Sequence, residues 1–126
     1  METKKKITLL LILCILWTIF ISICFLLPPS YVPKLNVIQL DKAVHFSFFF
    51  VLSVLFSLLF RLRTRKRFLL IIFLSTLVAF AYGGIIEVLQ QNFFHRTGDI
   101  YDLLADVTGG FFGAITYPLF IKYLRL

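Results

Sequence analysis

The sequence contains few charged residues and few cysteines. Only 15% of its 126 residues are charged and six are acidic, whereas hydrophobic residues make up 60% and the mean hydropathy is +0.97. So few charges cannot cover the surface of a soluble domain with this much apolar content. The composition therefore excludes an ordinary soluble domain and indicates a protein surrounded by a lipid bilayer.

The two cysteines, Cys14 and Cys24, lie in one apolar run. Ten residues of helix separate two side chains by about 15 Å, which is too far for a disulfide between them. We therefore expect neither a disulfide framework nor a cysteine metal site. The chain also lacks a serine-nucleophile motif, a phosphate-cradling glycine loop and a zinc-protease signature, so no motif demonstrates catalysis.

Four long apolar runs fill the chain, at residues 7–27, 43–60, 68–89 and 102–121. About 20 helical residues cross the hydrocarbon core, and backbone groups in lipid must be hydrogen-bonded within the segment. We expect an all-α, integral membrane four-helix bundle that forms a single transmembrane domain over residues 1–126. Pro28 and Pro29 end the first run without a small-residue cleavage pattern, which favours a retained helix over a cleaved signal peptide.

Basic residues predict how the bundle is oriented. Ten of the 13 Lys and Arg residues precede the first run, fill the second connection (residues 61–67) or follow the last run; Lys34, Lys42 and Arg96 lie on the other side. The positive-inside rule then places both termini in the cytoplasm. The net charge of +7 could also suggest nucleic acid. No nucleic-acid module is present, so we interpret the basic stretch as an anchor at lipid headgroups and expect membrane lipids as partners.

Polar residues gather on the predicted outer side, at the start of the second run, the end of the third and the start of the fourth. The candidate site residues are Asp41, Lys42, His45, Glu87, Gln90, Arg96, Asp99, Asp102 and Asp106. Ionisable groups at membrane depth are costly and commonly functional. Five carboxylates exceed the two fixed cations, so the group is expected to share protons or to hold a cation.

Local helix effects explain some of these residues but not all. Asp41 and Asp99 occupy positions where a helix N-cap is expected. Asp106 lies too far inside the last helix to act as a cap. Glu87 lies near the negative end of its own helix dipole, where a carboxylate is disfavoured, so it needs a cation, a shared proton or a ligand.

Several kinds of chemistry are compatible with this cluster. Glu87 or Asp106 could act as general acid or base, oriented by His45 or Gln90, and these three ionisable groups are the catalytic candidates. The remaining polar residues would bind substrate, with Arg96 or Lys42 on a lipid phosphate. A divalent metal among His45, Glu87, Asp102 and Asp106 lacks a tight ligand motif, so neither a metal nor another cofactor is predicted. Binding of a lipid without chemistry is equally compatible.

Several spaced motifs resemble the VanZ-like family over about residues 41–120. They are Asp41-Lys42-x-x-His45-Phe46, Glu87-x-x-Gln90, Arg96-x-x-Asp99-x-x-Asp102 and Gly109-x-x-x-Gly113. One departure is Asp106, where the family pattern has Asn. The resemblance implies a small bacterial integral membrane protein, and the family's namesake is associated with resistance to teicoplanin, a lipid-bearing glycopeptide antibiotic. It implies no established catalytic mechanism.

The leading hypothesis is a multi-pass protein of the bacterial inner (cytoplasmic) membrane. Its outward-facing acidic pocket would bind or act on an envelope lipid or a lipid-linked or lipoglycopeptide molecule and influence glycopeptide susceptibility. Whether it is an enzyme stays open. One alternative is a small dimeric transporter or proton-coupled carrier that uses Glu87 and Asp106. Another is a non-catalytic structural subunit in which the polar cluster joins helices.

Overall fold

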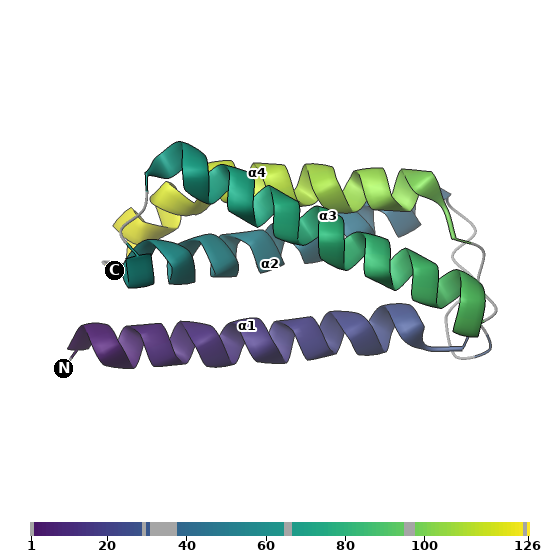
Figure 1. Cartoon of the computed structure of the whole chain (residues 1–126), viewed down its shortest axis with the longest axis horizontal. Coiled ribbons are helices and arrows are strands. Elements are labelled where there is room, and N and C mark those ends of the chain that lie inside the picture. The colour runs from purple at the N-terminus through teal and green to yellow at the C-terminus, as the bar shows by residue number, and fades with distance from the viewer. Residues whose placement is uncertain (1, 29, 31–37, 65–66, 95–97, 125) are drawn as a thin grey trace.

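The computed structural model describes residues 2–28, 30, 38–64, 67–94, 98–124 and 126. These residues form four long helices, as the apolar runs predict: α1 (Glu2–Leu26), α2 (Ile38–Thr64), α3 (Phe68–Phe93) and α4 (Ile100–Leu124). The chain begins and ends at the same end of the bundle (Figure 1). The four-helix prediction is confirmed, and each helix is long and apolar enough to cross a membrane.

The helices extend beyond most of the predicted boundaries. α2 begins at Ile38 rather than at residue 43, so Asp41 lies in the first turn of the helix and is not its N-cap. At the other end α2 continues through Arg61 and Arg63. Hydropathy marks the hydrocarbon thickness, whereas helical hydrogen bonding continues into the headgroup region, where charged side chains are solvated.

Packing between helices is uneven. α2 and α4 share the most extensive contact, α3 packs mainly on α4, and α1 lies against α2 and α3. One apolar core, which includes Leu58, Ile71 and Tyr117, lies nearer the terminal end, and a second includes Ile21, Phe49 and Ile86. Between them these cores fix the four helices relative to one another.

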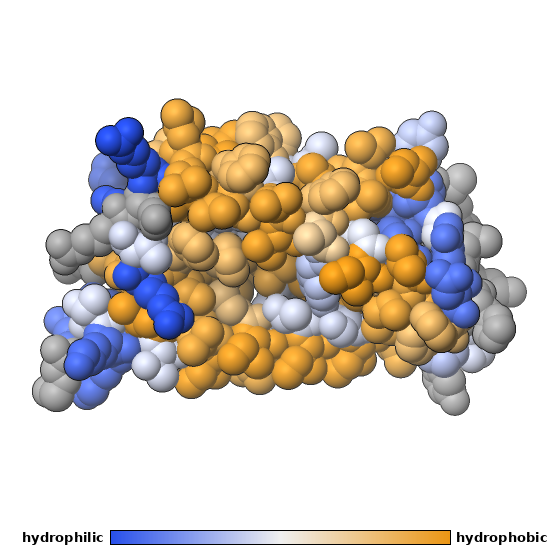
Figure 2. Space-filling model, in the orientation of Figure 1, coloured by the Kyte–Doolittle hydropathy of each residue, from blue (hydrophilic) through white to orange (hydrophobic). Residues whose placement is uncertain are grey.

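The outer surface of the bundle is apolar along its middle. Figure 2 shows a broad hydrophobic belt with hydrophilic residues gathered towards both ends. Large side chains such as Leu16 and Phe80 are more than half exposed there. Such a surface is stable against lipid and not against water. The chain is therefore a multi-pass membrane protein.

Glycines on α4 allow its close contact with α2. A Cβ atom at Gly109 would collide with the carbonyl oxygen of Phe46, and one at Gly113 with that of Phe50. Ser53 also donates a hydrogen bond of 2.5 Å to the carbonyl oxygen of Gly110. The small residues on α4 bring its acidic first turns directly against those of α2.

Candidate functional site

Three helix ends meet at the end of the bundle opposite the termini. α2 starts there, α3 ends there and α4 starts there (Figure 1). Two turns of each helix carry the candidate residues, and five of their side chains are buried: His45, Glu87, Gln90, Asp102 and Asp106. On α4 the buried residues include Asp102, Asp106, Gly109, Gly113 and Tyr117, which follow one face of the helix.

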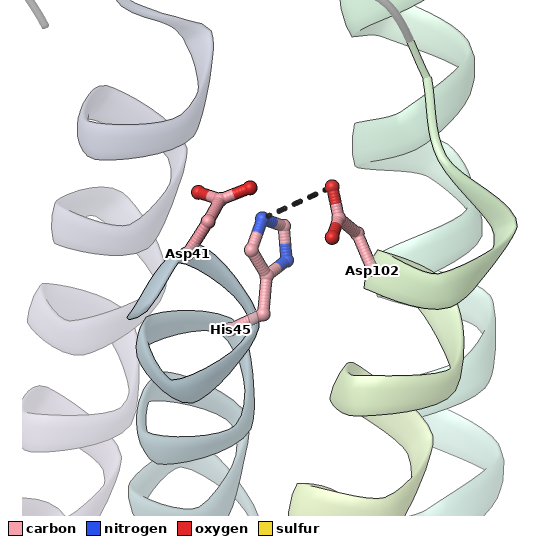
Figure 3. A group of neighbouring side chains, drawn as sticks. All are labelled: Asp41, His45 and Asp102. Atoms are coloured by element: carbon pink, nitrogen blue, oxygen red, sulfur yellow. Dashed lines mark ion pairs between the residues drawn. The ribbon is translucent and has the colours of Figure 1, made fainter. Parts of the chain in front are cut away.

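His45 lies at the centre of the group. Only 1% of its surface is exposed. Its Nδ1 atom lies 2.9 Å from Oδ1 of Asp106, and its Nε2 atom lies 3.9 Å from Oδ2 of Asp102. Figure 3 shows the imidazole between the carboxylates of Asp41 and Asp102. Phe25 stacks on the ring with centroids 4.1 Å apart and planes 15° from parallel, so the imidazole is held in one orientation.

Lys42 neutralises the outer part of the cluster. Its ammonium group lies 2.9 Å from Oδ2 of Asp99 and 2.9 Å from Oδ1 of Asp102. Hydrogen bonding to Lys42, helped by the backbone N–H of Tyr101, lowers the pKa of Asp99 below its ordinary 3.8. The single charge of Lys42 is therefore shared between two carboxylates, which weakens the prediction that it is available for a lipid phosphate.

Glu87 connects the end of α3 to the start of α4. Its Oε2 atom accepts a hydrogen bond of 3.0 Å from the backbone N–H of Asp99, the residue before α4. The carboxylate is thus disfavoured at the end of its own helix but stabilised by the positive end of the next one. The first effect follows from the sequence alone, whereas the second depends on the packing of α4 against α3. Oε1 of Glu87 is buried and has no hydrogen-bond partner among the described residues.

Asp106 is the most deeply buried acid, with no exposed surface. One oxygen contacts His45. The other, Oδ2, is directed at α3, because a Cβ atom at Gly83 would lie only 2.7 Å from it. Gly83 therefore makes room for this carboxylate one helical turn before Glu87. Oδ2 also has no hydrogen-bond partner within the described part of the chain.

The remaining candidates differ in their relation to this cluster. Asp99 caps α4 as predicted, since its Oδ1 atom accepts a hydrogen bond of 2.8 Å from the N–H of Tyr101. Gln90 is buried, but its amide donates to the carbonyl oxygen of Phe25 at 2.8 Å and so ties α3 to α1. Arg96 lies outside the described residues. Most of the predicted site is brought together, and Gln90 lies at its edge.

Two residues of the site were missed in the sequence. Phe25 lies in the last turn of α1 and in the sequence is only part of an apolar run, yet its ring stacks on His45. Gly83 is the second, because the absence of a side chain there admits the carboxylate of Asp106. For Gly83 the available signal was a glycine one turn before a buried acid. For Phe25 there was none, because nothing in the sequence indicates which helix packs against His45.

A small hollow adjoins the polar site, and a larger one lies further along the bundle towards the termini. A cavity of about 180 Å³ lies beside Glu87 and Asp99 and is also lined by Gln91, Gly98, Ile100 and Leu103. A larger apolar groove of about 400 Å³ runs between α1, α2 and α3, and Tyr82 lines it together with Leu11, Leu52 and Phe56. Tyr82 hydrogen-bonds to Ser22 and Thr18 on α1.

The site can hold and move protons, and its residues can also form metal-ligand sets. Asp106 orients His45, which is the arrangement of a histidine used as an acid or base. Two sets of three side chains have potential ligand atoms within 4.8 Å of one another: Asp41, His45 and Asp102 in the outer set, and His45, Glu87 and Asp106 in the inner set. Both sets share His45.

Comparison with known proteins adds one finding. A family model described as VanZ/LLP1 matches residues 7–121. Neither the curated proteins nor the solved structures give a match to the chain. The matched region includes nearly all of the four helices and every candidate site residue. This chain therefore belongs to the VanZ/LLP1 family.

Proposed function

We propose that this membrane protein binds an envelope lipid or a lipid-linked molecule at the polar site and thereby influences susceptibility to teicoplanin-type glycopeptides. The observation that carries the proposal is the cavity of about 180 Å³ against the buried carboxylate of Glu87. Purely structural polar residues would be expected to pair completely, whereas Glu87 lines a hollow and also keeps one buried carboxylate oxygen without a hydrogen-bond partner among the described residues.

The apolar groove supports a lipid rather than a fully polar ligand. It lies along α1, α2 and α3 at the depth of the hydrocarbon, and its walls are almost entirely apolar. Acyl chains are the molecules that fill such grooves in a membrane, because they form the solvent around the helices. The groove shares no lining residue with the cavity beside Glu87, so the two are separate hollows, and the groove supports only the apolar part of the ligand.

The basic residues also predict how the bundle is oriented in the membrane. The basic terminal end would face the cytoplasm, and the polar site would open on the outer side of the bacterial cytoplasmic membrane. Teicoplanin carries a lipid and acts at the cell envelope, so an outward site is where the protein could affect it.

The test compares the wild type with Glu87→Gln and Asp102→Asn in a bacterial host that lacks the native gene. Glu2→Gln is the matched control, because it removes a carboxylate from the opposite end, where Glu2 forms an ion pair with Lys6. Teicoplanin and vancomycin susceptibility would be measured at equal abundance in the membrane. We expect the wild type and Glu2→Gln to raise teicoplanin tolerance and the two site variants to match the empty host.

Two results would count against the proposal. If the abundant wild type leaves teicoplanin tolerance unchanged, the association with the antibiotic does not extend to this member of the family. If Glu87→Gln and Asp102→Asn protect as well as the wild type, the polar cluster is structural and another surface acts.

A further inference from the structure

Three helices each contribute one residue to the inner set. His45 comes from α2, Glu87 from α3 and Asp106 from α4, and all three are more than 90% buried. One potential ligand atom from each lies within 4.8 Å of the other two. Two atoms bound to one ion at about 2.1 Å can be at most about 4.2 Å apart, so only a small inward movement would bring the three atoms to a common ion.

Two carboxylate oxygens of this set lack a hydrogen-bond partner among the described residues. Oε1 of Glu87 and Oδ2 of Asp106 are buried without a hydrogen bond to any described residue. The second oxygen of each carboxylate is already used, by the N–H of Asp99 and by His45. Leaving a buried carboxylate oxygen unsatisfied is costly, so an additional positively charged or donating group is expected there.

Lys42 does not supply that charge. Its ammonium group pairs with Asp99 and Asp102 in the outer part of the cluster. Among the described residues of the inner set, two carboxylates therefore face a single imidazole. A divalent cation would balance this excess.

We propose that His45, Glu87 and Asp106 bind a divalent transition-metal ion of the Zn²⁺ or Mn²⁺ type. One imidazole nitrogen with two carboxylates is a donor set that suits these ions better than Mg²⁺ or Ca²⁺, which prefer oxygen alone. Nδ1 of His45, which lies 2.9 Å from Oδ1 of Asp106, is the ligating nitrogen, so the ion would replace the hydrogen bond between these two residues. Nε2 would then donate to the carboxylate of Asp102, the outer partner that commonly orients a metal-bound histidine (Figure 3).

This inference goes beyond the proposed function and is independent of any lipid. Three protein ligands leave coordination positions open, so the ion could bind a phosphate or carboxylate oxygen that the acidic cluster would otherwise repel. The protein's own residues provide the charge, the burial and the orientation of the histidine.

The experiment measures metal content in the purified full-length protein. The protein in detergent would be stripped with a chelator, incubated separately with Zn²⁺ and with Mn²⁺, desalted and analysed by mass spectrometry of the elements. We expect one ion per chain in the wild type and an affinity that is weaker by about tenfold or more in Glu87→Gln and Asp106→Asn. Asp41→Asn is the matched control, because it removes an acid from the outer set only, and it should retain the ion.

Two outcomes would overturn the inference. One is a wild-type protein that retains neither ion after reloading, which would mean that protons satisfy the free oxygens. The other is an equal loss in Asp41→Asn and Glu87→Gln, which would indicate diffuse binding to the acidic end. If the variants do not fold, Co²⁺ is added to the wild type and its absorption spectrum is recorded. A histidine–carboxylate site gives bands that free Co²⁺ lacks, so a spectrum identical to that of free Co²⁺ would contradict the inference. Loss of antibiotic protection with metal content intact would contradict only the proposed function.

Discussion

Asp99 joins three helices through its own atoms. Its backbone N–H donates to Glu87 on α3, one carboxylate oxygen caps α4, and the other pairs with Lys42 on α2. Because the pair with Lys42 lowers its pKa below 3.8, the folded protein takes up this proton less readily than the unfolded chain does. The stabilisation is therefore present above about pH 4 and is lost as the pH falls through the lowered pKa.

Asp99→Asn should remove that acid sensitivity. Asn is as good an N-cap as Asp and keeps the backbone N–H, so the cap and the bond to Glu87 are retained while the charge is lost. The melting temperature in detergent, measured between about pH 2 and pH 6, should fall less steeply with decreasing pH in the variant than in the wild type. Parallel curves for the two proteins would show that the pair with Lys42 contributes nothing to stability.

Some of the site could be predicted at the scale of the residue, and some could not. Helical periodicity places Asp102 and Asp106 on the same face as Gly109, and the structure confirms that face. The contacts between helices were not predictable, because a single sequence does not say which turn faces which. The stacking of Phe25 on His45 and the two bonds of Lys42 depend on that register.

At the scale of the helix, the approach of α4 to α2 depends on glycine. The carbonyl oxygens of Phe46 and Phe50 lie where Cβ atoms at Gly109 and Gly113 would be. Gly84 on α3 has open space around its Cβ position, with nothing within 4 Å. The sequence shows glycines on both helices, and only the packing distinguishes those that are required.

Gly109→Ala and Gly84→Ala form a matched pair for this contact. The first should lower the free energy of unfolding by about 2 kcal/mol, because backbone must move to admit the methyl group. The second should raise it by up to about 1 kcal/mol, the helix-propensity gain of alanine over glycine. Denaturant titration in mixed micelles measures both. Equal effects of the two substitutions would contradict the assigned contact.

At the scale of the whole molecule, the four spans and their order could be predicted because hydrocarbon thickness sets their length. Their exact ends could not, since polar residues such as Asp41 and Arg63 continue α2 past its apolar part. The shared end of the two termini follows from an even number of spans (Figure 1). Which end faces the cytoplasm stays a prediction from the basic residues.

Cysteine labelling tests that orientation. In a chain with Cys14 and Cys24 replaced by alanine, Asn92→Cys would mark the polar end and Thr64→Cys the basic end, and both positions are exposed. An impermeant maleimide added to intact cells should label the first and reach the second only after permeabilisation. The reverse pattern would place the polar site in the cytoplasm and would exclude an outward-facing pocket.

Whether the polar end is a binding site is tested most directly by native mass spectrometry of the protein released from detergent. We expect the wild type to retain a lipid from its host membrane. Glu87→Gln, with an unchanged melting temperature, should lose that lipid, whereas Glu2→Gln should keep it. If Glu87→Gln retains the same lipid in the same proportion, or if the wild type carries none, the cavity beside Glu87 is not a lipid-binding site and the proposed function is wrong.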